Sequence, residues 1–171
     1  MKYKGIVFDK DGTLIDFNAT WLPTYHFASL EFAQNDQALA AELLTHHGYN
    51  ANTRTVKGGS LLAAGNNEEI ALAWSKQLPG INSDSECKVM EKRLHDIFAE
   101  QGRLNTVAVS DLKPTLLRLK ESGLKLGIAT SDSYQGILNT LDAFDIISDF
   151  DFLCGYDSGH GVKPGPGMVQ A

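Results

Sequence analysis

Cysteine is scarce in this chain of 171 residues. The two that occur, Cys87 and Cys154, lie far apart and lack the spacing of a metal-binding pair, which suits a reducing compartment. Long apolar runs are missing as well. The run after Lys4 is interrupted at Asp9, too soon for a membrane span or a secretory signal. These absences predict a cytoplasmic protein that has no membrane partner.

Positive charge is also in short supply. The chain has 15 Lys and Arg residues against 21 Asp and Glu residues, which gives a net charge of −6. This balance argues against nucleic acid as a partner, so an anionic substrate would have to be attracted locally by a metal, a lysine or backbone amides. A hydrophobic content of 43% is enough to bury a core, and the length allows one domain with an insertion.

The segment that carries chemistry is residues 6–14, with the sequence IVFDKDGTL. A continuous apolar run is typical of a buried parallel strand, and ligands of such sheets collect beyond the carboxyl ends of the strands. Asp9 and Asp11 fall at that end. Side chains two positions apart point to one side of an extended chain, and Gly12 allows the chain to turn away. We therefore expect the two carboxylates to converge on one spot.

Two carboxylates held close together repel each other unless a cation lies between them. All-oxygen ligation favours Mg²⁺, which is typically held by one or two carboxylates, waters and a substrate phosphate. In such a site one aspartate can be the nucleophile and the other a proton donor and acceptor. An EF-hand is disfavoured, because its loop needs Gly sixth and Glu twelfth, whereas Gly12 is fourth from Asp9 and Thr20 is twelfth. A plain Asp-Gly surface turn is the simpler alternative, but no matching strand follows it.

Three segments together resemble the haloacid dehalogenase-like hydrolases, and in particular their phosphatase branch. Residues 9–14, DKDGTL, match the family's first motif, D-x-D-G-T-L. Residues 126–131, LGIATS, are similar to the second motif, and residues 161–166, GVKPGP, to the third. The resemblance covers residues 5–168, and the phosphoglycolate phosphatases are the nearest likeness through residues 155–164 and the pattern of the insertion.

The resemblance implies an α/β fold, a Rossmann-like parallel sheet core with an inserted all-helical cap. Residues 1–16 and 105–171 would form the core and residues 17–104 the cap. In this family the cap covers the active site, excludes water and selects the leaving group, a role that fits general lid physics.

The family's first motif implies roles for four residues here. Asp9 would be the nucleophile that forms an aspartyl-phosphate, and Asp11 the general acid and then the general base. Mg²⁺ would be held by the Asp9 side chain and by Asp11, in the family through its backbone carbonyl. Gly12 and Thr13 are expected to contact the substrate.

The second and third motifs imply a phosphate-binding set. Thr130, with the amides of Ser131 and Asp132 at a helix start, would hold the phosphoryl oxygens. Lys163 would complete the charge clamp. From the residues alone, Thr130 could equally be a simple N-cap and Lys163 a solvated loop lysine. Within the insertion, Lys57 and Ser60 are candidate substrate contacts, because the two glycines between them allow close backbone approach. The alternative is that this segment is a loop between helices with no role in binding.

The insertion shows helical spacing over residues 18–102 and no convincing strand. Its clearest helix is expected to begin at Ser83, where Ser83 and Glu86 form a candidate capping box. The same helix is expected to end at Gly102.

Helices and strands alternate from residue 107 onward. Strands are expected at residues 124–129 and 150–154, with a helix at 134–141 between them. An earlier helix would carry Pro114 in its first turn and end at Gly123. This alternation predicts a parallel sheet with right-handed crossovers.

The predicted function is that of a magnesium-dependent phosphatase that acts on a small phosphorylated metabolite similar to phosphoglycolate, as a monomer or homodimer. A phosphomutase or a phosphonate hydrolase on the same scaffold is an alternative, and the latter would need a Schiff-base lysine for which Lys57 is the positional candidate. A non-catalytic binding protein is a third reading. It is favoured by the C-terminus, because the fourth family motif supplies acidic magnesium ligands and residues 164–171 contain none. We therefore expect the chain to be a fragment that binds magnesium poorly as written.

Overall fold

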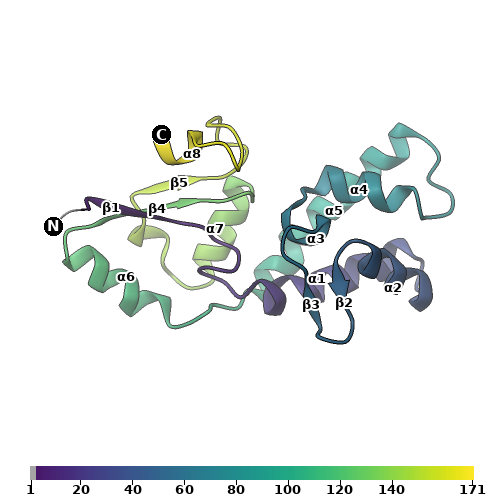
Figure 1. Cartoon of the computed structure of the whole chain (residues 1–171), viewed down its shortest axis with the longest axis horizontal. Helices are drawn as coiled ribbons and strands as arrows, with labels where there is room; N and C mark the ends of the chain where they lie inside the picture. The colour runs from purple at the N-terminus through teal and green to yellow at the C-terminus, as the bar shows by residue number, and fades with distance from the viewer. Residues whose placement is uncertain (1–2) are drawn as a thin grey trace. The chain divides into compact units, whose positions relative to one another are not determined.

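The computed structural model describes residues 3–171 and divides into two compact units. One unit comprises the residues up to 17 together with 106–171, and the other comprises residues 18–105. We call them the sheet unit and the inserted unit. Each is described separately below, with the element labels of Figure 1.

The sheet unit is built on three parallel strands. These are β1 (Gly5–Phe8), β4 (Lys125–Ala129) and β5 (Phe152–Cys154). Their spatial order is β1-β4-β5, with Ile6 opposite Leu126 and Ile128 opposite Leu153. The helices of this unit are α6 (Leu112–Glu121), α7 (Tyr134–Asp142), the 3₁₀ turn η1 (Ile147–Asp149) and α8 (Gly167–Gln170).

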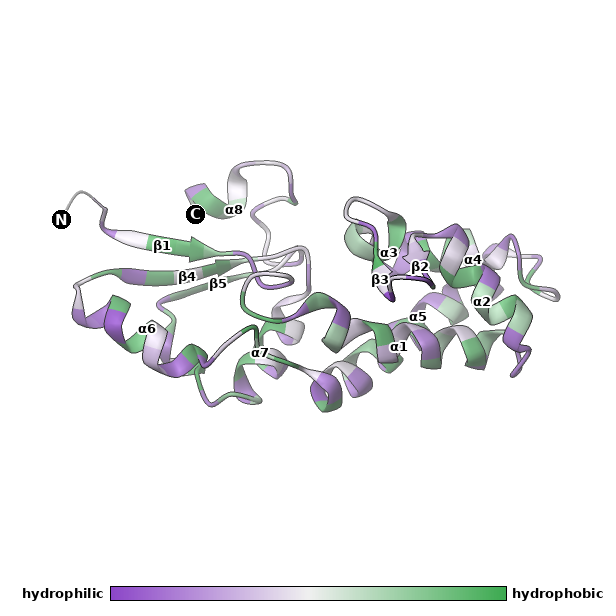
Figure 2. Cartoon of the chain, turned by 60° about the horizontal axis from the view of Figure 1, so that its bottom comes forward, coloured by the Kyte–Doolittle hydropathy of each residue, from purple (hydrophilic) through white to green (hydrophobic). Residues whose placement is uncertain are grey.

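The two faces of this sheet are covered by different helices. Leu126 and Ile128 pack with apolar residues of α6 and α7 on one face, including Leu116 and Ile137. On the other face, three buried side chains form a smaller cluster: Ala129, Cys154 and Met168. In Figures 1 and 2, α8 accordingly lies on the opposite side of the sheet from α6, and β1 and β4 are coloured as mainly hydrophobic. The α/β fold class with a parallel sheet is therefore confirmed.

The boundaries in this unit follow local signals. Pro114 lies in the first turn of α6, and Gly123, with a φ of 81°, follows its end in the left-handed region that favours glycine. The last strand begins at Phe152, two residues later than expected, because Phe150 caps the end of η1 with its amide bonded to the carbonyl of Ile147. The Asp151 carboxylate then accepts a hydrogen bond from the Leu126 amide, 3.0 Å away.

The inserted unit consists mainly of helices. They are α1 (Phe17–Phe32), α2 (Gln37–His46), α3 (Leu61–Ala64), α4 (Asn67–Ser75) and α5 (Asp84–Asn105). Aromatic side chains join α1 to α5: the rings of Trp21 and Phe98 stack at 5.5 Å, and Tyr25 meets Phe98 edge-on at 5.0 Å. Aromatic packing thus holds α1 against α5.

The expectation of an all-helical insertion without strands is wrong in one place. Two short antiparallel strands, β2 (Tyr49–Asn50) and β3 (Thr55–Val56), form a hairpin. Its turn is closed by the side chain of Asn50, which accepts hydrogen bonds from the amides of Asn52 and Thr53. Strands of two residues are too short to produce a visible alternation of apolar and polar residues, so periodicity missed them.

The expected end of α5 at Gly102 is also wrong. The helix continues to Asn105, and Gly102 is buried in its last turn. A Cβ at this position would lie 2.9 Å from the ring of Trp21. Gly102 therefore allows α5 to pack closely on α1 and does not end the helix. At the other end, the Ser83 hydroxyl accepts a hydrogen bond from the Glu86 amide at 3.3 Å, which is the Ser83 half of the predicted capping box, and the Glu86 carboxylate accepts one from the Asn82 amide at 2.8 Å.

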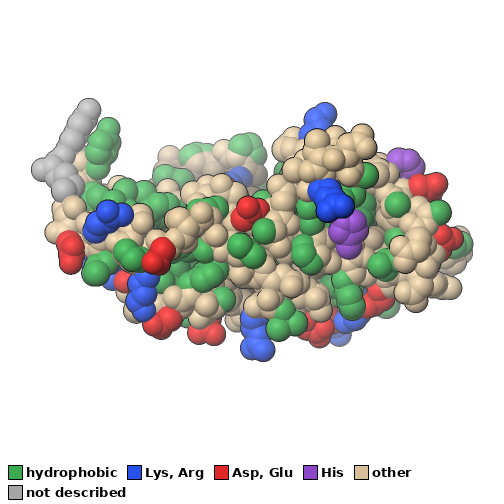
Figure 3. Space-filling model, turned by 90° about the horizontal axis from the view of Figure 1, so that it is seen from below, with side chains coloured by type: hydrophobic (Ala, Val, Ile, Leu, Met, Phe, Trp, Pro, Cys, Tyr) green, Lys and Arg blue, Asp and Glu red, His purple; other side chains and the backbone are tan. Residues whose placement is uncertain are grey.

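Charged side chains of both signs are scattered over the face shown in Figure 3. Among residues 3–171, no helix combines the length and the apolar character that crossing a membrane requires.

Candidate active site

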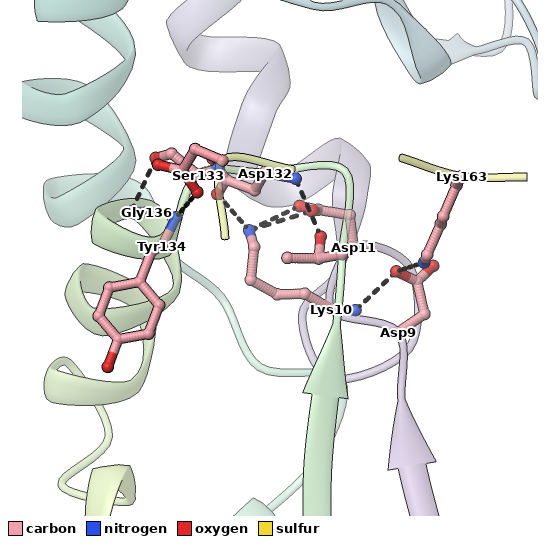
Figure 4. Close-up of polar contacts among 10 residues, drawn as sticks. Asp9, Lys10, Asp11, Asp132, Ser133, Tyr134, Gly136 and Lys163 are labelled. Carbon is pink, nitrogen blue, oxygen red and sulfur yellow. Dashed lines mark hydrogen bonds and ion pairs between the residues drawn. The ribbon is translucent and has the colours of Figure 1, made fainter. Parts of the chain in front are cut away.

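Asp9 lies directly beyond the carboxyl end of β1, with its side chain 46% exposed. Its Oδ1 accepts a hydrogen bond from the Lys10 amide at 2.9 Å. The same oxygen lies 2.6 Å from Nζ of Lys163, a residue 154 positions further along the chain (Figure 4). The structure thus brings together an accessible carboxylate and an ammonium group from the first and third motifs.

The chain turns sharply after Asp9. The backbone carbonyl of Lys10 accepts hydrogen bonds from the amides of Leu14 and Ile15, and Gly12 adopts a φ of 80° that favours glycine. Gly12 and Thr13 are both exposed on this turn. The turn therefore leaves both residues accessible to a ligand. Accessibility is what their predicted role as substrate contacts requires.

Lys10 is the residue of this loop that sequence reasoning missed. Its side chain is fully buried, and its Nζ lies 3.0 Å from a carboxylate oxygen of Asp11 and 3.0 Å from one of Asp132 (Figure 4). Burial alone would lower the pKa of Lys10, but the carboxylates of Asp11 and Asp132 outweigh it and the pKa lies above its ordinary value. Lys10 is therefore a buried cation with two acidic partners. A lysine between two acids at the end of an apolar strand was the signal available in the sequence.

Thr130 lies at the end of β4 and is buried. Its amide donates to the carbonyl of Cys154 at 3.0 Å, which ties the ends of β4 and β5 together. Its hydroxyl accepts a hydrogen bond from the Asp132 amide at 3.2 Å. Thr130 is therefore positioned by both the neighbouring strand and the loop that follows it.

The helix α7 begins at Tyr134, as expected, but the two amides that were expected at its start lie before it. The amides of Ser131 and Asp132 precede the helix, because its N-cap is Ser133, which accepts a hydrogen bond from the Gly136 amide at 3.0 Å. Thr130 is therefore not the N-cap of α7. The Tyr134 amide donates to Asp157 at 2.8 Å. Because the amides of Tyr134 and Gly136 are already paired in this way, an anion would have to be bound by amides of the loop before the helix.

Asp132 was expected to contribute only its backbone amide. In the structure its carboxylate also pairs with Lys10 and accepts a hydrogen bond from the Ser133 amide at 2.7 Å. The side chain thus joins the loop after β4 to the loop after β1.

The candidate contacts of the inserted unit have different surroundings. Lys57 is exposed, and its amide donates to the carbonyl of Gly48 at 2.8 Å. The Ser60 hydroxyl is buried, lies close to Gly48 and has no hydrogen-bond partner within the described residues. Ser60 stays a predicted substrate contact. The role of Lys57 stays a prediction.

The carboxylate of Asp9 supplies one donor for a hard divalent cation. Magnesium prefers oxygen ligands and typically takes one or two carboxylates, with waters and substrate oxygens completing the shell. The accessible Asp9 carboxylate, already paired with an ammonium, is such a donor. Within residues 3–171, no cluster of three or more His, Cys, Asp or Glu side chains is arranged to hold a metal.

Comparison with known proteins agrees with this arrangement. A model of the haloacid dehalogenase-like hydrolase family matches residues 3–171. Phosphoglycolate phosphatase from Pasteurella multocida is 30% identical over 169 residues, covering 96% of this chain and 68% of that protein. Phosphoglycolate phosphatase from Shigella boydii serotype 4 is 27% identical over 177 residues, covering 95% of this chain and 65% of that protein.

A solved structure shares the fold as well. The crystal structure of a predicted phosphoglycolate phosphatase from Haemophilus somnus 129PT is 23% identical, with a TM-score of 0.71, and the match covers 99% of this chain and 70% of that one. The chain spans about two thirds of the length of the curated relatives named above. It belongs to the haloacid dehalogenase-like hydrolase family, in the branch that resembles the phosphoglycolate phosphatases. Its family and relatives make it an enzyme of the hydrolase class.

Proposed function

We propose that this protein is a magnesium-dependent phosphatase that hydrolyses a small phosphorylated metabolite similar to phosphoglycolate, through an aspartyl-phosphate on Asp9. The observation that carries the proposal is the pairing of Asp9 with Lys163. It presents an accessible carboxylate oxygen beside a positive charge, at the sheet edge where ligands of parallel sheets bind.

The first step of the proposed reaction is a displacement at phosphorus. A carboxylate oxygen of Asp9 attacks in line with the leaving oxygen, so a bond from that oxygen to phosphorus forms and the ester bond breaks. Asp11 donates its proton to the leaving oxygen, which departs as an alcohol. The products of this step are the aspartyl-phosphate and the anion of Asp11.

The second step returns the enzyme to its starting state. A water molecule attacks the aspartyl-phosphate while Asp11, now a base, takes its proton. The bond between phosphorus and the Asp9 oxygen breaks, and inorganic phosphate leaves. Asp9 is again a carboxylate and Asp11 is again protonated, so no oxidant or second substrate is needed.

The remaining site residues stabilise charge and position the phosphoryl group. The Lys163 ammonium would balance negative charge on the phosphoryl oxygens, and the Thr130 hydroxyl with the amide of Ser131 would donate hydrogen bonds to them. The exposed turn at Gly12 and Thr13 would contribute further contacts. Such preorganised donors are the main source of catalysis in phosphoryl transfer, which needs positioning more than covalent assistance.

Magnesium would be held by the Asp9 carboxylate and by Asp11 through its backbone carbonyl. When bound, it would neutralise the phosphoryl oxygens and so offset their repulsion from the nucleophile. The inserted unit, residues 18–105, is proposed to act as the cap that excludes water and selects the leaving group. A small anionic metabolite suits this proposal because the relatives that support it are phosphoglycolate phosphatases.

The proposal is tested with the full-length protein and a panel of phosphorylated small carboxylates and sugars, assayed for phosphate release with and without Mg²⁺. We expect phosphoglycolate or a close analogue to be among the best substrates, and EDTA to abolish turnover until Mg²⁺ is restored. Failure to hydrolyse any phosphate monoester in the presence of Mg²⁺ would overturn the proposal.

A further inference from the structure

A buried lysine joins the two loops of the candidate site, and the proposed reaction leaves it without a role. Nζ of Lys10 lies 3.1 Å from Oδ1 and 3.0 Å from Oδ2 of Asp11, and 3.0 Å from Oδ2 of Asp132. A buried ammonium group is tolerated when charged partners surround it, because desolvation otherwise opposes its charge. The three groups therefore fix one another, and they come from the ends of two neighbouring strands.

Two glycines next to this bridge leave space for it. Gly136 lies in α7, where alanine is ordinarily the better helix former. A Cβ there would lie 2.4 Å from both carboxylate oxygens of Asp132 and 2.5 Å from its Cγ. A Cβ on Gly155 would lie 2.6 Å from the carbonyl oxygen of Asp132 and the amide of Tyr134. The helix and the loop after β5 thus both make room for Asp132 in its present position.

We propose that Lys10 is a positioning residue for the reaction. Together with Asp132, for which Gly136 leaves the space, it holds the Asp11 carboxylate where a proton can pass to and from the reacting oxygen. Asp9 and Lys163 do not depend on this bridge, since they contact each other directly. The inference rests on the proposed function, because it assigns Lys10 to the orientation of the proposed general acid.

The first test compares Lys10→Met and Asp132→Asn with the unchanged full-length protein on two substrates. Misplacing Asp11 should lower kcat for phosphoglycolate about 10- to 100-fold, as loss of a supporting contact typically does. The loss should be clearly smaller for 4-nitrophenyl phosphate, whose leaving group needs little protonation. KM should stay within about 2-fold, because the groups that bind phosphate are unchanged. Equal losses on the two substrates, or no loss, would overturn the proposal.

A matched control separates this effect from the loss of any ion pair in the same unit. Lys113 pairs with Asp145 at 2.6 Å, and both side chains are largely exposed. Lys113→Met should therefore leave both rates unchanged. Lys10→Arg keeps the charge and should restore part of the activity on phosphoglycolate. An Arg variant as impaired as Lys10→Met on that substrate would count against the charge bridge.

Gly136→Ala tests the bridge without touching either of its charges. Helix propensity alone predicts a neutral or stabilising change. The bridge predicts a lower kcat on phosphoglycolate, because the new methyl group displaces the Asp132 carboxylate. When Gly136→Ala is combined with Asp132→Asn, the fold loss in kcat should be smaller than the product of the two separate fold losses, since both substitutions act on one carboxylate. Full activity of Gly136→Ala, or multiplicative losses, would contradict the inference.

A stability measurement keeps the inference separate from the proposed function. If the unchanged protein hydrolyses no phosphate, the proposed function fails, but the bridge itself can still be tested by thermal unfolding. Lys10→Met and Asp132→Asn should each lower Tm by roughly 5 to 10 °C, and the double variant should lose less than the sum. Additive losses would overturn the bridge. If Lys10→Met does not fold, the double-mutant cycle uses Asp132→Asn and Gly136→Ala instead. The combined loss of Tm should again be smaller than the sum of the two separate losses.

Discussion

The two units of this protein place their charges differently. In the sheet unit, the fully buried Lys10 pairs with two carboxylates at the ends of the strands. In the inserted unit, Arg93 and Glu31 pair at the surface, where their side chains are 39% and 34% exposed. A buried cation has to be held by its partners, whereas a surface pair is free to exchange with water. The difference indicates that the strand ends of the sheet unit, where the candidate site lies, bury a charge, whereas this pair of the inserted unit stays at the surface.

The interiors repeat this contrast. The most prominent buried side chain of the inserted unit is Trp74, which is fully buried and meets Phe32 edge-on with ring centres 6.3 Å apart. At the carboxyl ends of the sheet strands, the buried side chains include the charged Lys10, whereas the buried polar side chains of the inserted unit, Thr20, Thr24 and Ser29, are neutral. Substitution of Asp9 or Asp11 at the strand ends of the sheet unit should therefore act mainly on activity, and truncation of Trp74 in the inserted unit should act on stability.

The largest expected effect is that of Asp9→Asn. It removes the proposed nucleophile and a proposed magnesium ligand but keeps the size of the side chain. Turnover should fall to below a few per cent, while the circular dichroism spectrum and Tm stay close to those of the unchanged protein. Asp145→Asn, which alters a largely exposed aspartate of the same unit, is the matched control and should retain full activity. Substantial residual turnover in Asp9→Asn would remove the nucleophile assignment.

Asp11→Asn should have the next largest effect on activity. Loss of a general acid typically costs about 10²- to 10⁴-fold, and the cost depends on the leaving group. Rates for phosphoglycolate should fall much further than rates for 4-nitrophenyl phosphate. Steady-state assays of both substrates measure this ratio, and an unchanged ratio would argue against proton transfer by Asp11.

In the inserted unit, Trp74→Ala should act on stability. Truncation of a fully buried tryptophan leaves a large cavity and costs about 3 to 5 kcal/mol of unfolding free energy. Urea unfolding followed by circular dichroism measures the loss. The cost should exceed that of Asp9→Asn. If Asp9→Asn proves the more destabilising of the two, the division between packing and chemistry is wrong.

A smaller cost is expected for Gly102→Ala. Although alanine favours helices, its methyl group would approach the ring of Trp21 to about 3 Å, so α1 and α5 would have to separate slightly. Overpacking of this kind typically costs about 1 to 3 kcal/mol. A gain in Tm would show that the contact between Gly102 and Trp21 adjusts freely. In a Trp21→Leu background, the smaller side chain should reduce the stability cost of Gly102→Ala.

The smallest effect is expected at the Arg93–Glu31 pair. The hydrogen bond from Arg93 is the main cause that holds the pKa of the Glu31 carboxyl below its usual range. A carboxyl with a lowered folded pKa stabilises the protein above the pKa of the unfolded state, about 4.3, and loses that contribution as pH falls further. Arg93→Met should therefore lower Tm slightly at pH 7 and by a smaller amount near pH 3. An equal difference at both pH values would show that the arginine acts through packing.

Much of this architecture could be predicted from the sequence because the signals are local. The apolar run before Asp9 and the cluster of turn residues around Gly123 each report on neighbouring residues. The pairing of Asp9 with Lys163 was implied only by the family resemblance, since no local signal joins residues 154 positions apart. Lys10 was missed because its neighbours, Asp9 and Asp11, have obvious chemistry and an intervening lysine is usually solvated.

The remaining errors concern tertiary contacts. Glycine often follows the end of a helix, but the role of Gly102 is set by its close packing against Trp21, which lies far away in the sequence. The helix α7 begins at Tyr134, as expected, but its cap could not be chosen from the sequence: Thr130, Ser131 and Ser133 are all plausible caps, and only the structure shows that Ser133 bonds to the Gly136 amide. Residues of this kind have partners that periodicity cannot identify.

The central claim is that Asp9 carries the phosphoryl group during turnover. Full-length protein mixed with phosphoglycolate and Mg²⁺, quenched in acid within milliseconds and digested, should give a peptide spanning Asp9 that bears one phosphoryl group by mass spectrometry. The label should disappear on longer incubation and be absent from Asp9→Asn. A protein that releases phosphate at its full rate with no label on this peptide, or with the label on another residue, would contradict the account.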